Sequence, residues 1–204
     1  MIYLIRHTTP AVTRGICYGQ TDLDVTESFR EEAEVIRQHL PADIAAVYSS
    51  PLKRCTLLAQ TLFPDRPLRL MGELMEIHCG EWEMRTWDEL PPAEVDPWMA
   101  DFVRVRMPGG ESYLELHERV TRCWEGILRE NTSGDIAIVA HGGVLRSILS
   151  GINDTPLIDS FSTYSLNYGC VIRLSETEGR WQYEVLWNQA RTEKEQHKPK
   201  SFYR

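Results

Sequence analysis

The sequence predicts an α/β protein with three layers, in which helices cover both faces of a mostly parallel central sheet that has an antiparallel edge strand. Short apolar runs alternate with segments whose apolar residues recur at helical spacing, and this alternation is typical of parallel sheets. The runs are too short to span a membrane, and several end at polar residues. At 204 residues and 42% hydrophobic, the chain is long enough for a sizeable core, and we expect one domain over residues 1–204.

The first strand is predicted over residues 2–5, where an apolar run leads into Arg6 and His7 and then into a turn at Pro10. In open α/β sheets, ligands bind at the carboxyl ends of the strands. Residues 11–25 contain glycines and aspartates without periodicity, which predicts a loop close to this ligand edge.

The next two helices follow from capping residues and prolines. Thr26 offers an N-cap hydroxyl for a helix that ends before Pro41. Residues 44–48 form a second apolar run, and Pro51 suits the first turn of a helix that carries Arg54. Strand and helix therefore alternate through the first third of the chain.

Residues 68–70 are a candidate third strand, and the segment after them, residues 73–83, is dense in carboxylates. Residues 87–108 are interrupted by prolines but hold large apolar side chains, so we interpret them as a helical cap inserted over the site. A packed excursion without substrate contact is the alternative. The tryptophans of this region are expected in the core, although one of them could stack on a flat base of the substrate; they are Trp82, Trp87 and Trp98.

The last part of the chain begins with a long helix predicted from Ser112 to residue 127. Residues 136–140 are then the clearest buried strand, which ends at His141 and two glycines before another helix. Strands around residues 170–174 and 183–187 are expected to form a hairpin at one sheet edge. From residue 188 the chain is polar, which predicts a solvated tail or a cover over the sheet edge.

Charge and cysteine usage exclude several functional classes. The net charge of −8 argues against binding to nucleic acid or to an anionic membrane, while it allows a local cationic pocket. The five cysteines form no Cys-x-x-Cys pair, and no signal peptide opens the chain, so we expect reduced thiols in the cytoplasm. No metal site and no cofactor are expected, and the protein is expected to be a monomer or a homodimer.

Four nitrogen-bearing side chains are expected to converge at one sheet edge. Arg6 and His7 end the first strand, Arg54 follows the second, and His141 ends the strand over residues 136–140. Guanidinium groups match the oxygens of a phosphate bidentately, so these side chains predict a pocket for phosphate.

A histidine in such a pocket can attack phosphorus and hold the phosphoryl group covalently, and His7 suits this role. The arginines and a protonated His141 would stabilise charge on the transferring group. The leaving alkoxide also needs a proton from a carboxylic acid. Glu73, Glu76 and Glu81 are all candidates for this acid; we choose Glu76, although the residues alone do not rank it above the other two.

Five motifs occur in order along residues 1–175: Arg6-His7-Thr8, the stretch from Ser49 to Arg54, the stretch from Leu74 to Glu83, Gly110-Glu111-Ser112, and the stretch from Ala140 to Gly143. Together they resemble the histidine phosphatase superfamily, which has the phosphoglycerate-mutase-like fold. The resemblance implies that His7 is phosphorylated, that Arg6, Arg54 and His141 complete the phosphate pocket, and that Glu76 is the acid and base.

Within that family, the short chain is more similar to the small phosphatases than to the mutases. The resemblance implies a small-molecule phosphomonoester as substrate, and the leading candidate is α-ribazole 5′-phosphate of cobalamin biosynthesis. An alternative function is that of a phosphatase with broad specificity. A phosphomutase must hold a second anionic group, for which we find no extra basic cluster, and a non-catalytic phosphate-binding module is a third alternative. Substrate contacts are expected from Arg6, Arg54, His141, Thr13, Gln20 and Gly142.

The chain departs from the family pattern directly after Arg6-His7. Members commonly continue with Gly-Glu and have an asparagine further on, whereas Thr8, Thr9 and Thr13 stand at these positions here. The resemblance therefore implies one phosphate contact fewer, which the hydroxyl of Thr13 could replace.

Overall fold

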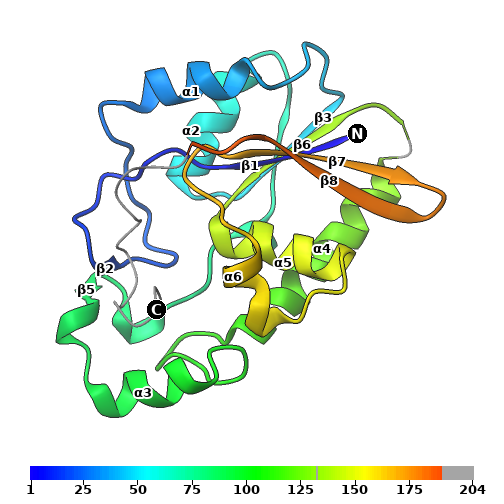
Figure 1. The fold of residues 1–204 in the computed structure, drawn as a ribbon. Coiled ribbons are helices and arrows are strands. Elements are labelled where there is room, and N and C mark those ends of the chain that lie inside the picture. Colours follow the sequence, from blue (N-terminus) through cyan, green and yellow to red (C-terminus); the bar gives the residue numbers. More distant parts are fainter. Residues whose placement is uncertain (132, 190–204) are drawn as a thin grey trace.

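The centre of the molecule is a six-stranded sheet, seen in a computed structural model that describes residues 1–131 and 133–189 (Figure 1). Its strands are β1 (Ile2–Arg6), β3 (Ala46–Ser49), β4 (Leu68–Leu70), β6 (Ile136–Ala140), β7 (Val171–Thr177) and β8 (Arg180–Trp187). The spatial order is β4-β3-β6-β1-β7-β8. The first four strands in this order are parallel, and β7 runs antiparallel to both β1 and β8. The predicted parallel sheet with an antiparallel edge is confirmed.

Helices cover both faces of this sheet, as Figure 1 shows. Because side chains alternate along a strand, Ile5 and Val139 belong to the core with α1 (Phe29–Arg37) and α2 (Lys53–Leu62), whereas Leu4 and Ile138 belong to the core with α4 (Tyr113–Glu130) and α5 (Gly142–Ile152). The long helix α4 starts with a capping box between Ser112 and Glu115. The helices are α1 (Phe29–Arg37), α2 (Lys53–Leu62), α3 (Pro92–Ala100), α4 (Tyr113–Glu130), α5 (Gly142–Ile152) and α6 (Ser160–Thr163).

Three local predictions were wrong. The N-cap of α1 is Ser28. Thr26 lies before it in a turn, where the Thr26 carbonyl accepts a hydrogen bond from the Phe29 amide. Pro51 lies before the N-cap of α2, because the chain is still extended at Leu52. The predicted loop over residues 11–25 contains the short strand β2 (Ile16–Cys17), which pairs with β5 (Arg85–Thr86).

Residues 81–110 form an excursion whose two ends lie side by side. The Glu81 amide donates to the Pro108 carbonyl at 2.8 Å, and the Glu111 amide donates to the His78 carbonyl at 2.9 Å. Gly80 has φ +55°, and a Cβ there would lie 2.1 Å from the Pro108 oxygen, so only glycine permits this approach. Helix α3 lies within the excursion, together with the short 3₁₀ turn Trp87–Glu89. The other short 3₁₀ turns are Gly72–Leu74, Gly80–Trp82 and Leu157–Asp159.

The polar segment after β8 is described only at its start. The Asn188 side chain donates to the Ser165 carbonyl at 2.7 Å and accepts from the Asn167 amide at 2.9 Å, which fastens it to the segment before β7. Most of the predicted tail, residues 190–204, lies outside the described residues. In the ranges 1–131 and 133–189, no helix combines the length and the apolar character needed to cross a membrane.

Candidate active site

Two neighbouring parallel strands deliver the first three polar side chains of the site. Arg6 is paired with Ala140, so β1 and β6 end at the same level, and the His7 amide donates to the Ala140 carbonyl at 3.0 Å. The rings of His7 and His141 are consequently close, with centroids 5.1 Å apart. Arg54 joins them from the first turn of α2. We call Arg6, His7, Arg54 and His141 the anion pocket; each is at most 6% exposed.

The tautomer of His7 is fixed by its own loop. Its Nδ1 lies 2.7 Å from the Thr8 carbonyl, and because a carbonyl only accepts, Nδ1 carries the proton. In the neutral imidazole the lone pair is therefore on Nε2, the nitrogen that a nucleophilic histidine uses.

His141 has different surroundings. Its Nε2 lies 2.8 Å from the Ser50 hydroxyl and 3.5 Å from the Cys55 sulfur. Burial, and then the positive charge of Arg54, hold the pKa of His141 well below its usual range. These effects favour the neutral imidazole in the pocket without an anion, and the protonated His141 expected beside a transferring phosphoryl group stays a prediction. The neutral form is favoured because α2 and β1 bring two guanidinium groups close to a fully buried ring.

Backbone carbonyls hold both guanidinium groups of the anion pocket. Arg54 donates to the carbonyls of Thr21 at 2.8 Å and Gly19 at 2.9 Å. Arg6 donates to the Leu166 carbonyl at 2.5 Å. Carbonyl partners orient a guanidinium group and leave its positive charge in place, as they do for Arg54, so this part of the pocket suits an anion.

The structure separates the three candidate carboxylates. Glu73 and Glu81 are exposed, whereas Glu76 lines the cavity described below. The two Glu76 carboxylate oxygens accept from the amides of Ile77 at 3.0 Å and Gly143 at 3.1 Å. A Cβ on Gly143 would lie 2.3 Å from the nearer oxygen, so this approach requires a glycine at the start of α5.

Arg119 fastens the segment that carries Glu76, and sequence reasoning missed it. From α4 its guanidinium donates to the carbonyls of Glu73 at 2.6 Å, Met75 at 2.8 Å and Glu76 at 3.0 Å. Glu111 pairs with the same guanidinium at 2.5 Å. The spacing of Arg119 on a long amphipathic helix gave no signal, because the contact depends on the fold of a distant loop.

The remaining predicted contact residues lie at different distances from the site. Gly142 lines the cavity at the N-terminus of α5. Gln20 donates to the Glu76 carbonyl at 2.9 Å, so it holds the backbone of the segment that carries Glu76. The structure does not bring Thr13 to the anion pocket, because Thr13 is exposed in a turn that the Ile16 amide closes.

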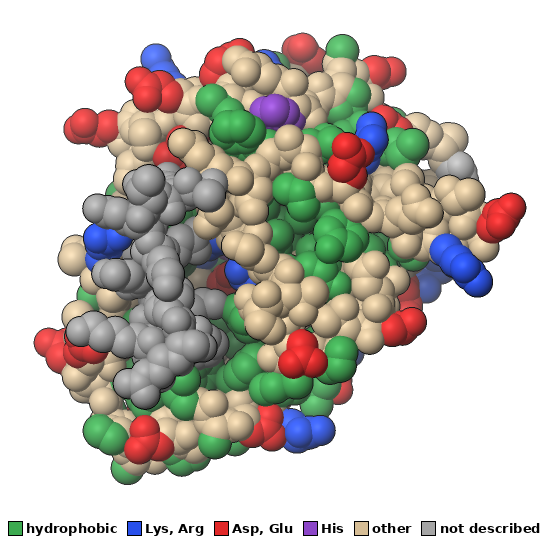
Figure 2. All heavy atoms as spheres, in the orientation of Figure 1, with side chains coloured by type: hydrophobic (Ala, Val, Ile, Leu, Met, Phe, Trp, Pro, Cys, Tyr) green, Lys and Arg blue, Asp and Glu red, His purple; other side chains and the backbone are tan. Residues whose placement is uncertain are grey.

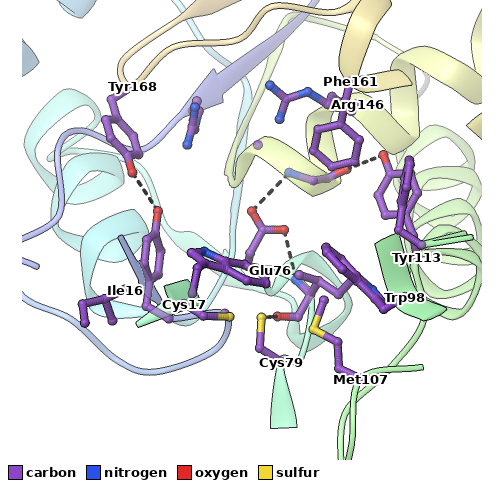
Figure 3. Close-up of a pocket in the computed structure, with 18 residues that line it drawn as sticks. Ile16, Cys17, Glu76, Cys79, Trp98, Met107, Tyr113, Arg146, Phe161 and Tyr168 are labelled. Atoms are coloured by element: carbon purple, nitrogen blue, oxygen red, sulfur yellow. Dashed lines mark hydrogen bonds between the residues drawn. The ribbon is translucent and has the colours of Figure 1, made fainter. Parts of the chain in front are cut away.

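Next to the anion pocket lies a mostly apolar cavity of about 870 Å³, measured out to its open mouth (Figure 3). Trp87 and Trp98 stack on each other at 5.6 Å in its wall, while the fully buried Trp82 lies behind them in the core. Glu76 points into the cavity between its two sides (Figure 3). Other lining residues include Ile16, Cys17, Ile77, Cys79, Phe102, Met107, Tyr113 and Phe161.

Three further polar side chains of this cavity were missed. The hydroxyls of Tyr18 and Tyr168 are 2.8 Å apart, and the Tyr168 ring lies 4.1 Å from Arg6 Cζ. Arg146 lines the cavity from α5, donates to the Tyr164 carbonyl at 3.0 Å and lies over the Phe161 ring. Its position four residues after Gly142, on the same helix face, is a signal that could have identified it. The cavity therefore holds a cation in addition to Arg6, which the sequence analysis did not expect.

The exterior has the opposite character to the anion pocket. Acidic side chains are distributed around the face shown in Figure 2. The described residues contain no group of three or more His, Cys, Asp or Glu side chains that is arranged to hold a metal ion.

Comparisons with known proteins agree with this geometry. A family model described as "Histidine phosphatase superfamily (branch 1)" matches residues 2–189. A metal-independent phosphoserine phosphatase of Arabidopsis thaliana is 30% identical over 81% of this chain and 74% of its own. An adenosylcobalamin/α-ribazole phosphatase of Salmonella typhimurium is 26% identical over 93% of this chain and 96% of its own.

A solved structure shows the same fold. The α-ribazole phosphatase of Shigella flexneri superposes with a TM-score of 0.83 over 90% of this chain and 94% of its own, at 24% identity. With the family model matching nearly the whole described chain, the chain belongs to the histidine phosphatase superfamily.

Proposed function

We propose that this chain is a phosphomonoesterase that works through a covalent phosphohistidine at His7. The observation that carries the proposal is the Nδ1 contact of His7 with the Thr8 carbonyl, which directs the lone pair of Nε2 to the side of the ring away from that carbonyl. Family membership supports the phosphatase class. The His141 ring lies 5.1 Å from the His7 ring, and the guanidinium groups of Arg6 and Arg54 would supply the donors that a phosphate needs.

In the first step, Nε2 of His7 attacks phosphorus, a P–N bond forms and the P–O bond to the leaving group breaks. The guanidinium groups of Arg6 and Arg54 stabilise the charge on the equatorial oxygens. Glu76 gives its proton to the leaving oxygen, and the product alcohol departs through the cavity.

In the second step, water replaces the alcohol. Glu76, now a carboxylate, takes a proton from the water while the water oxygen attacks phosphorus and the P–N bond breaks. Inorganic phosphate leaves, and both His7 and Glu76 return to their starting protonation states.

For the leaving group we propose α-ribazole, so that the substrate is α-ribazole 5′-phosphate. The aromatic wall of Trp87, Trp98 and Phe102 suits a planar apolar base, and the cavity adjoins the anion pocket. The name of the Salmonella relative, which aligns with 93% of this chain, supports the same choice.

A phosphomonoester that bears a carboxylate is the second candidate, because Arg146 adds a cation to the cavity wall. Phosphoserine is such an ester, and the name of the Arabidopsis relative refers to it. A substrate panel separates the candidates. We expect the highest kcat/KM with α-ribazole 5′-phosphate; a higher value with phosphoserine that is lost in Arg146→Leu selects the second candidate.

Quenching during turnover tests the covalent step. We expect a ³²P-labelled chain whose label is stable in base and labile in acid, and we expect His7→Ala to lose both the label and more than about 10⁴-fold in kcat. His39→Ala is the matched control, since the His39 ring stacks on Trp187 outside the anion pocket. Undiminished turnover by His7→Ala would contradict the mechanism. Phosphoryl exchange between phosphoglycerates that greatly exceeds phosphate release would identify a phosphomutase.

A further inference from the structure

Two thiols meet in the wall of the leaving-group cavity. Cys17 from β2 and Cys79 from the segment after Glu76 both line it, and their sulfurs point toward each other (Figure 3). The two residues are 3% and 4% exposed, so they are shielded by protein but border the cavity.

The backbone on both sides of this pair is held in place. The Glu83 carboxylate accepts from the amides of Gln20 at 3.0 Å and Cys79 at 3.2 Å, and from the Thr21 hydroxyl at 2.5 Å. The Met84 amide donates to the Cys17 carbonyl at 2.7 Å. The segments that carry the two thiols are therefore joined by one carboxylate and one backbone bond, which keeps the sulfurs facing each other.

The two thiols are not equivalent. The neighbouring Cys17 side chain, and then burial, raise the pKa of the Cys79 thiol well above its usual value. Cys79 thus keeps its proton and donates it to the Ile77 carbonyl at 3.7 Å. A thiol that holds its proton is the poorer nucleophile, so Cys17 is the sulfur that attacks first.

We propose that Cys17 and Cys79 are a reversible dithiol site, which closes to an intramolecular disulfide when a low-molecular-weight disulfide enters the cavity. The Cys17 thiolate attacks one sulfur of the oxidant, which forms a mixed disulfide and expels one thiolate. That thiolate takes the proton from Cys79. The Cys79 thiolate then attacks the Cys17 sulfur and expels the second thiolate, which takes up the proton released earlier from Cys17. The chain loses two hydrogens and two electrons, and the oxidant becomes two thiols.

Closure changes the cavity next to the reacting groups. The two sulfurs must approach to about 2.05 Å, which draws their segments together. Cys17 precedes Tyr18, whose ring lies 5.4 Å from Arg54 Cζ, and the Cys79 sulfur contacts the Ile77 carbonyl beside Glu76. A displacement of about 1 Å near reacting groups costs on the order of 100-fold in rate, so the disulfide form should be a poorer enzyme.

The test uses bis(2-hydroxyethyl) disulfide on the full chain, with intact-mass measurement and peptide mapping. We expect a mass loss of two hydrogens located to a Cys17–Cys79 bridge, a fall of roughly tenfold or more in kcat/KM relative to the same sample before treatment, and recovery with dithiothreitol. Cys123→Ser is the matched control: Cys123 is buried in α4, outside the cavity lining, so this variant should still form the bridge.

Each single variant, Cys17→Ser and Cys79→Ser, is compared with its own untreated form. We expect neither to lose two hydrogens, and we expect Cys79→Ser to retain the mixed disulfide on Cys17. A wild-type chain that forms no bridge, or a bridge that leaves kcat/KM unchanged, overturns the proposal. Intact-mass measurement detects the bridge directly. The result for bridge formation therefore does not depend on which substrate the enzyme uses or on whether His7 is the nucleophile.

Discussion

The two histidines of the anion pocket have the same buried position but different partners. The Nδ1–H group of His7 donates a hydrogen bond to a backbone carbonyl, which can only accept. His141 instead contacts a hydroxyl and a thiol, each of which can donate or accept. His7 is therefore restricted to one tautomer, and His141 is able to change its protonation state when charge arrives.

This difference predicts proton uptake on anion binding. The pKa of His141 is held well below its usual range by burial and by Arg54, and a bound dianion raises it because opposite charge favours the imidazolium. One pKa belongs to His141 in the empty pocket, and the other, higher pKa belongs to His141 beside bound sulfate. Between these two values the protein with protonated His141 binds sulfate more tightly, so the affinity for sulfate should fall as pH rises through this range.

Calorimetry in buffers of different ionisation enthalpy measures this uptake. We expect up to about one proton taken up per sulfate by the wild type and a clearly smaller number by His141→Asn. Sulfate is the suitable probe because it does not itself titrate in the neutral range. Equal proton uptake by both proteins would remove His141 from this role.

Replacement of the proposed acid predicts a dependence on the leaving group. Glu76→Gln keeps the size of the side chain but cannot protonate an alkoxide, so kcat for an alkyl phosphate should fall by about 10²–10⁴-fold. p-Nitrophenyl phosphate should lose much less, since its leaving group departs without a proton. Steady-state kinetics with both esters provide the comparison, and an equal loss for both would show that Glu76 acts only by binding.

The start of helix α5 contributes to the site through its backbone. The Gly143 amide binds Glu76, and the glycine leaves room for the carboxylate. Gly142, one residue earlier, lies beside Arg6 and Arg146, so two successive glycines let the helix end approach both the acid and the cations.

A matched pair of glycine substitutions tests this use of the helix. Gly143→Ala places a methyl group 2.3 Å from a Glu76 oxygen, so kcat should fall as the carboxylate moves away. Gly126→Ala in α4 meets no atom within 4 Å and should leave kcat unchanged, while it stabilises the fold by roughly 0.5–1 kcal/mol. Kinetics and thermal unfolding measure both effects. Full activity of Gly143→Ala would mean that Glu76 is not held where the amide places it.

The elements that sequence predicted well are those whose signal is local. Buried apolar runs identified β1 and β6, and the polar residues directly after them identified His7 and His141, because a strand end has a known relation to the ligand edge of a sheet. Arg119 and Tyr168 could not be found in this way. Their importance comes from contacts with residues more than 40 positions away, which no local periodicity records.

Across the whole molecule, the sheet edge supplies the histidines of the anion pocket, and residues 81–110 supply much of the cavity wall. Trp87, Trp98, Phe102 and Met107 all belong to this excursion, whereas His7 and His141 follow strands of the sheet. Under the proposed function, the chemistry and the leaving-group preference thus belong to different parts of the chain.

This division predicts a selective effect of one substitution in the excursion. Trp87→Ala should lower kcat/KM for α-ribazole 5′-phosphate by roughly 10- to 100-fold through lost stacking and burial, and it should change kcat/KM for glycerol phosphate by less than about threefold. Trp181→Ala is the control, because Trp181 packs on Trp124 outside the cavity. Equal losses for both esters would assign Trp87 to stability rather than to selectivity.

The closed ends of residues 81–110 have a consequence for the diversification of this protein. Since Gly80 and Gly110 hold the two ends together, the entropic cost of closing this loop grows only slowly with its length, by about 0.6 kcal/mol per doubling. Insertions at its exposed positions are therefore inexpensive for the fold and leave the strand ends in register, whereas the buried Trp82, Trp98 and Phe102 must keep their places in the core. New substrate preferences can arise by exchange of this one segment, which makes it a natural position for recombining parts of related chains.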